Sequence, residues 1–401
     1  MKYIELMKLK NEICNNYISL YEKKGFKKIQ SLPLDNKKDI TVDYTTCTIC
    51  SAKDNIINNV VDDDYVMIQP ALRNTHINNL SNVKDKNYFL SYFTMIGGFR
   101  YYNNNRNVEK FSEVIESEFD FLSSYGNQVI LTIPIQYKKF LQLTDECFKY
   151  LKDKKCEIYY SENDEENLKW KYGIGGVEGY GTRWEISNGG DLVNYGNTIN
   201  VIRNGIPFGV DFGGGLESIV YANQKLKSSI YANDALTDYC SDFCKKNDLN
   251  EKIIDCIVSA MCIISNKEKI ILRDKIILDT YMRILYSLTL IEDISREQIL
   301  SIVKDIDKQN IPTLKKEKIE EIFSYYLSKI DEEFFILIES KNINKVLQLV
   351  NLCYNENNEW LKSKRIVKSH YKKYFSNLSE VDLLALKKKK CLILEGEKNN
   401  D

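Results

Sequence analysis

The amino-acid sequence predicts an α+β fold in which a part containing β-strands is followed by an α-helical part. Two observations lead to this expectation. Strand-like segments, rich in apolar and aromatic residues, recur up to residue 212. Beyond residue 222, apolar residues instead recur at the three- and four-residue spacing of amphipathic helices. We therefore expect two domains, residues 1–222 and residues 223–401, which suits a chain of 401 residues.

Charge and composition restrict the classes of function. The 56 basic and 57 acidic residues give a net charge of −1, so any contact with nucleic acid must depend on a local basic patch. The first residues lack an apolar leader, and no apolar stretch approaches the ~18 residues that span a bilayer. Together with 11 cysteines, these features predict a soluble, cytoplasmic protein of a reducing compartment, without membrane contact.

The first expected elements are a helix and a strand. The helix covers residues 3–24, and Gly25 ends it. Its apolar stripe comprises Leu6, Leu9, Ile13, Tyr17 and Leu20. Residues 39–46 alternate between polar and apolar side chains and predict a strand.

A cysteine pair follows this strand. Cys47 and Cys50 have the C-x-x-C spacing, but one pair cannot complete a tetrahedral metal site. Cys240 and Cys244 are the candidates for the missing ligands, almost 200 residues away. We therefore expect ordinary thiols at these positions and predict no metal site.

Two further strands are predicted over residues 65–73 and 88–96, separated by a polar loop that contains His76. The first strand ends at Arg73. An arginine at a strand end suits a phosphate or carboxylate ligand, because its planar guanidinium binds two oxygens at once. The alternative is a surface ion pair with the acidic run at residues 62–64.

A glycine run lies between the strand-containing and the helical parts. Residues 209–212 end a strand, and Gly213 to Gly215 follow before an apolar helical segment. We expect these glycines to form the turn that opens the helix, since glycine accepts close approach by backbone or ligand. Asp211 precedes them and would face whatever the glycines accommodate. Close packing of strand against helix, without a ligand, is the alternative explanation.

These segments resemble the catalytic domain of alanyl-tRNA synthetases, a family of class II aminoacyl-tRNA synthetases. Residues 68–80 and 92–99 resemble the two strands and the loop of motif 2, with Arg73 at the end of the first strand. Residues 210–217, VDFGGGLE, resemble the motif 3 sequence VDTGMGLE.

Segments between the two motifs are similar to the family as well. Residues 167–170, NLKW, are similar to the family's DNFW, and residues 191–194, DLVN, to its EIWN. The resemblance spans residues 1 to about 222 in consistent order. It implies a class II synthetase-like antiparallel sheet flanked by helices.

The resemblance implies a role for each matching residue. Arg73 would bridge the amino-acid carboxylate and the α-phosphate of ATP, and Asp211 would receive the amino acid's ammonium group. Trp170 and Asn194 would form a wall and a polar contact of a pocket for an alanine-sized side chain. Five residues are expected to contact ATP, by binding phosphate, by stacking on adenine or by leaving room for adenosine: Arg73, Tyr92, Phe93, Gly213 and Gly215.

Some family residues on the ATP side are replaced. Ser218 stands where motif 3 ends in an arginine that holds the γ-phosphate, and Thr94 replaces a glutamate of motif 2. Losing one charge-assisted phosphate contact costs roughly 1.5–3 kcal/mol. Arg183, which has no counterpart in the family, is a candidate substitute. An ion pair with Glu185 or Glu178 is the alternative role for this arginine.

Beyond residue 222, helices are predicted over residues 230–244, 249–264, 270–289 and 295–307. The last of them begins with Ser295 and Gln298 at the spacing of a capping box. This part resembles the family's tRNA-acceptor-binding domain only weakly, and the family's editing and C-terminal dimerisation domains have no counterpart.

A basic, aromatic stretch between residues 362 and 375 has two explanations. It either contacts an RNA backbone or forms the solvated face of an amphipathic helix, and the second is favoured.

The predicted function is ATP-dependent activation of a small, alanine-like amino acid as an aminoacyl-adenylate, followed by transfer to an acceptor. Arg73 and Arg183 are the expected catalytic residues, and ATP and Mg²⁺ the expected cofactors. The acceptor is left open between tRNA, a carrier protein and a small-molecule amine. The alternative is a non-catalytic paralogue that binds an amino acid or tRNA for regulation, which the degenerate motif 3 favours. The sequence does not indicate the oligomeric state.

Overall fold

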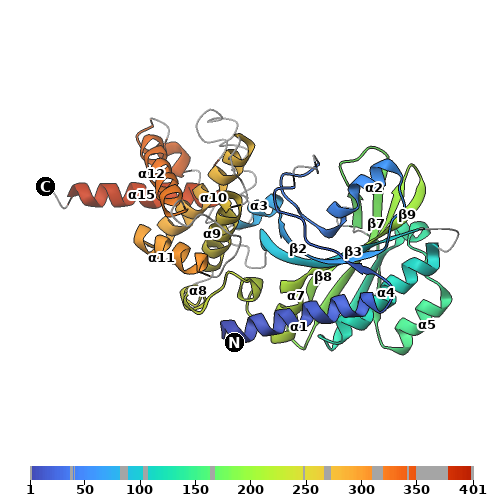
Figure 1. Cartoon of the computed structure of the whole chain (residues 1–401). Helices are drawn as coiled ribbons and strands as arrows, with labels where there is room; N and C mark the ends of the chain where they lie inside the picture. Colours follow the sequence, from blue (N-terminus) through green and yellow to red (C-terminus); the bar gives the residue numbers. More distant parts are fainter. Residues whose placement is uncertain are drawn as a thin grey trace. The chain divides into compact units, whose positions relative to one another are not determined.

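The computed structural model describes residues 2–36, 39, 41–81, 89–102, 107–162, 168–246, 249–265, 272–308, 319–340, 343–348 and 378–398. The chain divides into two compact units (Figure 1). The first comprises Met1–Arg73 and Tyr92–Asp234, and the second comprises Asn74–Ser91 and Ala235–Asp401. The first unit thus extends past residue 222, and the loop after Arg73 belongs to the helical unit.

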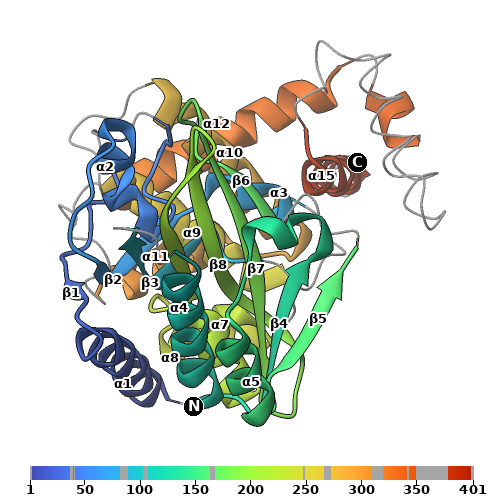
Figure 2. The same cartoon turned by 90° about the vertical axis from the view of Figure 1, so that its right-hand side faces the viewer.

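One mixed sheet, in which nine strands are described, forms the first unit. The strands are β1 (Lys27–Lys28), β2 (Tyr65–Leu72), β3 (Tyr92–Tyr101), β4 (Gln128–Pro134), β5 (Glu157–Ser161), β6 (Lys169–Lys171), β7 (Val177–Ser187), β8 (Val193–Arg203) and β9 (Ile206–Gly215). Their order is β1-β2-β3-β9-β8-β7-β4-β5, with β6 paired to β7 (Figure 2). Neighbouring strands are antiparallel except β1 with β2 and β4 with β5. A mainly antiparallel sheet flanked by helices confirms the α+β class.

Helices cover one face of this sheet. They are α1 (Tyr3–Glu22), α4 (Asn107–Ser123), α5 (Asp145–Asp153) and α7 (Leu216–Gln224), and they form one apolar core with the strands (Figure 1). The other face carries a smaller apolar cluster that includes Phe99 and Ile199. The 3₁₀ turn η1 (Thr48–Ser51) and helix α2 (Lys53–Asn58) cover it, and their residues Ile49 and Ile56 belong to the same cluster. This second face, which contains Phe99 and Ile199, is the site face.

The first two predicted elements had different outcomes. Helix α1 occupies Tyr3–Glu22, which confirms the amphipathic N-terminal helix. The predicted strand at residues 39–46 is wrong, because the described residues there form turns and bends. The Asp39 carboxylate accepts hydrogen bonds from Thr41 N and Thr41 Oγ1 at 3.0 and 2.6 Å. It also pairs with Lys53 at 2.7 Å. These polar side chains bond locally instead of joining a strand ladder.

The strand predicted over residues 88–96 is displaced toward the C-terminus. Strand β3 begins at Tyr92 and continues through Gly97 and Gly98. These glycines do not end the strand, because the neighbouring strands leave no room for a side chain there. A Cβ would lie 2.3 Å from Phe212 O at Gly97 and 2.0 Å from Tyr65 O at Gly98.

The glycine run after Asp211 also remains in a strand. Gly213 to Gly215 complete β9, and helix α7 begins directly at Leu216. The turn predicted over these glycines is therefore wrong. Gly213 adopts a φ of +132°, and a Cβ on it would lie 2.2 Å from Ile96 O, so this position needs glycine for both reasons.

The second unit is helical. Its described elements are the 3₁₀ turn η2 (Asn74–His76) and the helices α3 (Ile77–Leu80), α8 (Asp238–Cys244), α9 (Leu249–Ser265), α10 (Leu272–Ile291), α11 (Arg296–Asp307), α12 (Ile319–Ile338) and α15 (Glu380–Lys398). Helix α10 packs against α9, α12 and α15.

Most helices predicted for this unit are confirmed. The capping box of α11 forms as expected, with Ser295 and Gln298 bonding each other's backbone N–H. The helix predicted from residue 230 starts only at Asp238, because the Thr237 side chain caps it. The basic stretch at residues 362–375 lies outside the described residues. None of the described helices is long and apolar enough to cross a membrane.

Candidate functional site

A row of residues across four strands forms the floor of the candidate site. Phe99 of β3, Asp211 of β9, Ile199 of β8 and Gly181 of β7 are paired in register. Asp211 is only 6% exposed. Burial raises the pKa of its carboxyl group well above the ordinary value, so an unpaired carboxylate is costly here. A cationic ligand would compensate for that cost.

Two aromatic side chains, one in β6 and one directly after it, lie over glycines of β7. Trp170 covers Gly181, where a Cβ would come within 2.5 Å of Cζ3 of the indole ring. Tyr172 covers Gly179 in the same way, at 2.8 Å from its hydroxyl oxygen. The Tyr172 hydroxyl donates a long hydrogen bond, 3.4 Å, to Oδ2 of Asp211. Adjacent strands are ~4.8 Å apart, so about 10 Å separates the Gly181 backbone under Trp170 from that of Asp211.

Arg73 follows directly after β2 and reaches the same face. Its Nε donates to Thr46 O at 3.1 Å, and its guanidinium lies 5.0 Å from the centre of the Phe93 ring. Among the described residues it forms no salt bridge. The charge of Arg73 acts on Asp211 and lowers the pKa of that carboxyl group, against the larger effect of burial. The ion pair with residues 62–64 that the sequence left open is not formed in the described part of the chain.

The segment before helix α2 is fixed to β2 by several hydrogen bonds. Leu72 N donates to Thr45 O at 3.0 Å, and the Tyr65 hydroxyl donates to Thr48 O at 2.9 Å. Lys53, 5% exposed, pairs with Asp39. These bonds hold four residues of the segment above the site face: Cys47, Cys50, Lys53 and Thr46, whose carbonyl oxygen Arg73 contacts.

Phe93, which the sequence analysis expects to contact ATP, lies close to Gly215 and Ser218. Phe93 Cδ2 lies 4.0 Å and Ser218 Oγ 3.3 Å from the position of a Cβ on Gly215. Strand alternation places Phe93 on the site face and Tyr92 on the opposite face. Phe93 and Gly215 therefore lie together next to Ser218, the position that is an arginine in the resembling family.

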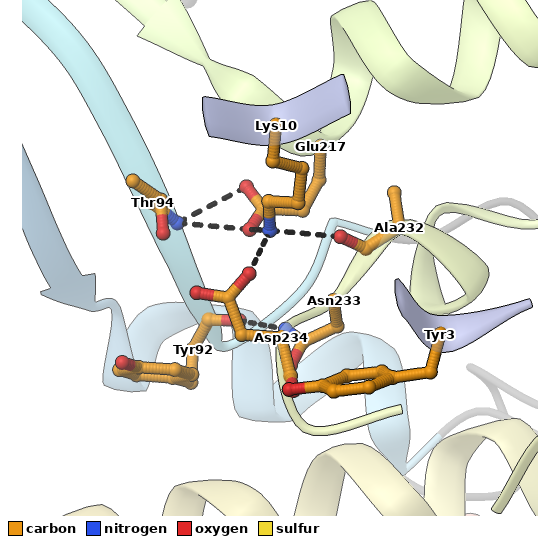
Figure 3. A network of polar contacts seen from close by, with 8 residues as sticks. All are labelled: Tyr3, Lys10, Tyr92, Thr94, Glu217, Ala232, Asn233 and Asp234. Carbon is orange, nitrogen blue, oxygen red and sulfur yellow. Dashed lines mark hydrogen bonds and ion pairs between the residues drawn. The ribbon is translucent and has the colours of Figure 1, made fainter. Parts of the chain in front are cut away.

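Tyr92 instead belongs to a buried polar network on the helical face (Figure 3), where its carbonyl oxygen accepts from Asn233 Nδ2 at 2.9 Å. Of the two aromatic residues that the sequence offered for adenine stacking, only Phe93 is thus available on the site face.

Arg183 and Asn194 lie on the site face but farther from Asp211. Arg183 is in register with Asn197 and, across β8, with Gly213. Its Nε lies 3.4 Å from Oε2 of Glu185, so the ion pair considered from the sequence is present. Asn194 pairs with Glu185, four residues along β7 from Gly181, which corresponds to about 13 Å along the strand.

Two neighbours of Asp211 were not found as site residues from the sequence. Tyr172 lies two residues after Trp170, and this i, i+2 spacing in a strand was the available signal that both share a face. Cys47 was considered only as a metal ligand, yet its charge raises the pKa of Asp211, second to burial.

The network of Figure 3 supports the site from the helical face of the sheet. Both carboxylate oxygens of Glu217 accept from Thr94 N, at 3.2 and 3.0 Å. Lys10 Nζ donates to Glu217 at 3.0 Å and to Ala232 O at 2.9 Å, and it also pairs with Asp234. Glu217 thus connects β3, which carries Phe93, to the start of helix α7.

A cavity of about 540 Å³ lies near residues 173–178, with Phe140 and Tyr180 in its lining. Neither Arg73 nor Asp211 lines it, so it is separate from the candidate site. Among the described residues, no group of three or more His, Cys, Asp or Glu side chains is arranged to hold a metal ion.

Comparisons with known proteins identify a structural likeness but no family. No family model matches the sequence, and no curated protein matches it. Among solved structures, the chain is similar to apo histidyl-tRNA synthetase of S. aureus, with 12% sequence identity and a TM-score of 0.34. The match covers 54% of this chain and 70% of that chain. Similarity at this level does not identify a substrate or an activity.

Proposed function

We propose that this protein binds a small amino acid and ATP and joins them into an aminoacyl-adenylate. The observation that carries the proposal is the pair of Asp211 and Arg73. A buried carboxylate and an arginine without an acidic partner among the described residues lie over one sheet face, each influencing the other's ionisation. These two charges are complementary to the ammonium and carboxylate groups of an amino acid.

In this proposal Asp211 binds the ammonium group, and Trp170 and Tyr172 limit the side chain to about the size of alanine. Arg73 binds the carboxylate and the α-phosphate of ATP. A carboxylate oxygen attacks the α-phosphorus, the bond to the leaving oxygen breaks, and pyrophosphate departs. The guanidinium neutralises charge on the transferring phosphoryl group.

The nucleotide would stack its adenine on Phe93. Arg73 now covers one face of that ring, so it has to leave the ring if adenine uses the same face. Mg²⁺ would be bound mainly by the phosphates of ATP, because the described residues offer no complete cage for it.

The direct test is amino-acid-dependent exchange of labelled pyrophosphate into ATP, measured with each proteinogenic amino acid. We expect exchange with alanine, glycine or serine. Arg73→Gln should reduce it at least 100-fold, since about 3 kcal/mol of charge stabilisation is lost. An amino acid that binds in calorimetry but supports no exchange would contradict the ligase.

The acceptor of the aminoacyl group is identified in a separate assay. Labelled amino acid can be supplied with ATP and either total tRNA, purified carrier proteins or small amines. Label that is released from the macromolecular fraction by ribonuclease identifies tRNA, and label that remains with protein identifies a carrier.

A second candidate function is amino-acid sensing without chemistry. Ser218 favours it, because it leaves the γ-phosphate without the arginine of the resembling family, and Arg183 is already paired with Glu185. Ser218→Arg discriminates between the two. If the site performs weak adenylation, the variant should bind ATP roughly tenfold or more tightly and exchange faster. An inactive parent and an inactive variant, both binding the amino acid, would support the sensor.

A further inference from the structure

Two thiols lie at the η1 turn that covers the site face: Cys47 directly precedes the turn, and Cys50 belongs to it. The sulfur atoms of Cys47 and Cys50 are 3.7 Å apart, and both cysteines are free. Cys47 is partly exposed, whereas Cys50 is 6% exposed. A disulfide needs a separation of about 2.05 Å, so closing this pair requires a local movement of less than 2 Å.

The two thiols differ in acidity in a way that assigns them different roles. The hydrogen bond from Cys50 lowers the pKa of Cys47 to about 6, with help from the charges of Arg73 and Lys53. The same hydrogen bond, together with burial, raises the pKa of Cys50. By contrast, burial raises the pKa of Cys240 to about 12. Cys47 is thus the nucleophile, and Cys50 is placed to attack any disulfide formed on it.

We propose that Cys47 and Cys50 are a modification site that exchanges with low-molecular-weight disulfides, such as oxidised glutathione, and that the resulting protein disulfide disables amino-acid binding at Asp211. The exchange itself depends only on the two thiols. Its consequence for binding rests on the proposed function.

The exchange is balanced by the small disulfide. The Cys47 thiolate attacks one of its sulfur atoms, which forms a mixed disulfide and releases one thiolate. Cys50 gives its proton to solvent and attacks the sulfur of Cys47, which closes the protein disulfide and releases the second thiolate. Counted from its dithiol form, the protein loses two electrons and two protons. The small disulfide gains the two electrons, and its two released thiolates become thiols by taking up two protons from solvent.

The η1 turn is connected to both charged residues of the candidate site, Arg73 and Asp211. Thr46 O, directly before Cys47, accepts the hydrogen bond from Arg73 Nε. The Cys47 charge also acts on Asp211. Drawing the two sulfur atoms together displaces the Thr46 carbonyl, so Arg73 loses the hydrogen bond that holds it over the site face. Removal of the thiolate lowers the pKa of Asp211 and acts in the opposite direction, so the loss of amino-acid binding is assigned to the displaced Arg73.

The exchange is tested by mass mapping. The tryptic peptide 39–53 contains both cysteines, and after treatment with oxidised glutathione it should be two hydrogens lighter. Cys50→Ser should retain glutathione on Cys47, and Cys47→Ser should form neither product. Alkylation of Cys47 should have a midpoint near pH 6. At pH 7 it should be on the order of tenfold faster than alkylation of Cys391, an exposed control thiol. Equal rates, or no lighter peptide, would overturn the proposal.

The consequence is tested by calorimetry of the full chain before and after oxidation. Amino-acid affinity of the wild type should fall roughly tenfold or more and return with a reducing thiol, since Arg73 loses a charge-assisted hydrogen bond. Neither Cys47→Ser nor Cys50→Ser should form a protein disulfide when it is oxidised, and the affinity of each variant is compared with that of its own untreated form. A disulfide that leaves the affinity unchanged overturns the regulatory half. If the reduced protein binds no amino acid but its thiols still exchange with oxidised glutathione, the proposed function is refuted instead.

Discussion

Asp211 is a buried carboxyl group whose ionised form is costly. Its pKa is raised first by burial and then by Cys47, and it is lowered by Tyr172, Arg73 and Lys53. Below this raised pKa the carboxyl group holds a proton, which the ammonium group of the proposed amino-acid ligand would displace. Affinity should therefore weaken by about tenfold for each pH unit below that pKa and level off above it.

Calorimetry in buffers of different ionisation enthalpy measures this proton release. The wild type should release up to one proton per bound amino acid as pH falls, and Asp211→Asn should release none. Binding that is independent of pH, with no proton released, would mean that Asp211 is not the ammonium site.

Glu118 makes a second residue-level prediction, on stability. It is fully buried and accepts hydrogen bonds from the hydroxyl groups of Tyr17 and Tyr21, at 2.8 and 2.6 Å. Burial raises its pKa to about 7 from an ordinary 4.5. The folded state thus holds the proton more tightly than the unfolded state, so this contribution to stability is complete below pH 4.5 and is lost as pH rises through 7.

Urea unfolding of the wild type and Glu118→Gln, from pH 4 to 8, checks this. As pH rises over this range, the unfolding free energy of the wild type should fall by about 3 kcal/mol relative to that of Glu118→Gln. Glu12→Gln, at an exposed position of helix α1, is the control and should show no such shift. A constant difference across the range would contradict the assignment.

At the residue scale, the sequence was informative where charge and glycine patterns are unusual. Arg73 at a strand end and Asp211 before a glycine run were singled out through the family resemblance, and the structure places both over the site face. Tyr172 was missed although its i, i+2 spacing from Trp170 indicated a shared face. The chemistry of Cys47 was missed because it depends on contacts with residues far along the chain that no local spacing encodes. The roles of these residues stay predictions.

At the element scale, Lys10 joins helix α1 to helix α7 and thereby to β3. It is 2% exposed and pairs with Glu217 and Asp234 (Figure 3). Lys10→Met should destabilise the protein by roughly 3–5 kcal/mol, because it leaves Glu217 buried without its cation. Lys8→Met, exposed on the same helix, should change stability by less than ~0.5 kcal/mol.

Equilibrium unfolding by two probes measures both variants. A loss below ~1 kcal/mol for Lys10→Met would indicate that Glu217 takes up a proton or water instead. Such a result would mean that this network does not stabilise the connection between β3 and α7.

Element boundaries were less predictable than element types. The helical spacing of α1 and α11 located both, because amphipathic periodicity and capping are local. The strand β3 and the glycines of β9 were placed wrongly, because glycine reads as a turn in sequence. Here close strand packing, visible only in three dimensions, requires glycine within the sheet.

At the scale of the whole molecule, the α+β class followed from periodicity together with the family resemblance, and the helical continuation followed from periodicity. The assignment of residues 74–91 to the helical unit did not, since a loop's packing partner is a long-range property. The first unit is nonetheless predicted to bind the amino acid by itself within the full chain, because every proposed binding residue belongs to it. Tryptophan fluorescence can follow this unit separately.

The chain has three tryptophans, of which Trp170 and Trp184 belong to the first unit. Trp360→Phe therefore leaves fluorescence that reports this unit alone. An amino acid at 100 times its Kd should stabilise the fluorescent transition by about 2.7 kcal/mol, seen as a higher urea midpoint. Asp211→Asn in the same background should abolish the shift. If calorimetry detects binding while the midpoint of the fluorescent transition stays fixed, the amino acid binds elsewhere and the Asp211 pocket is wrong.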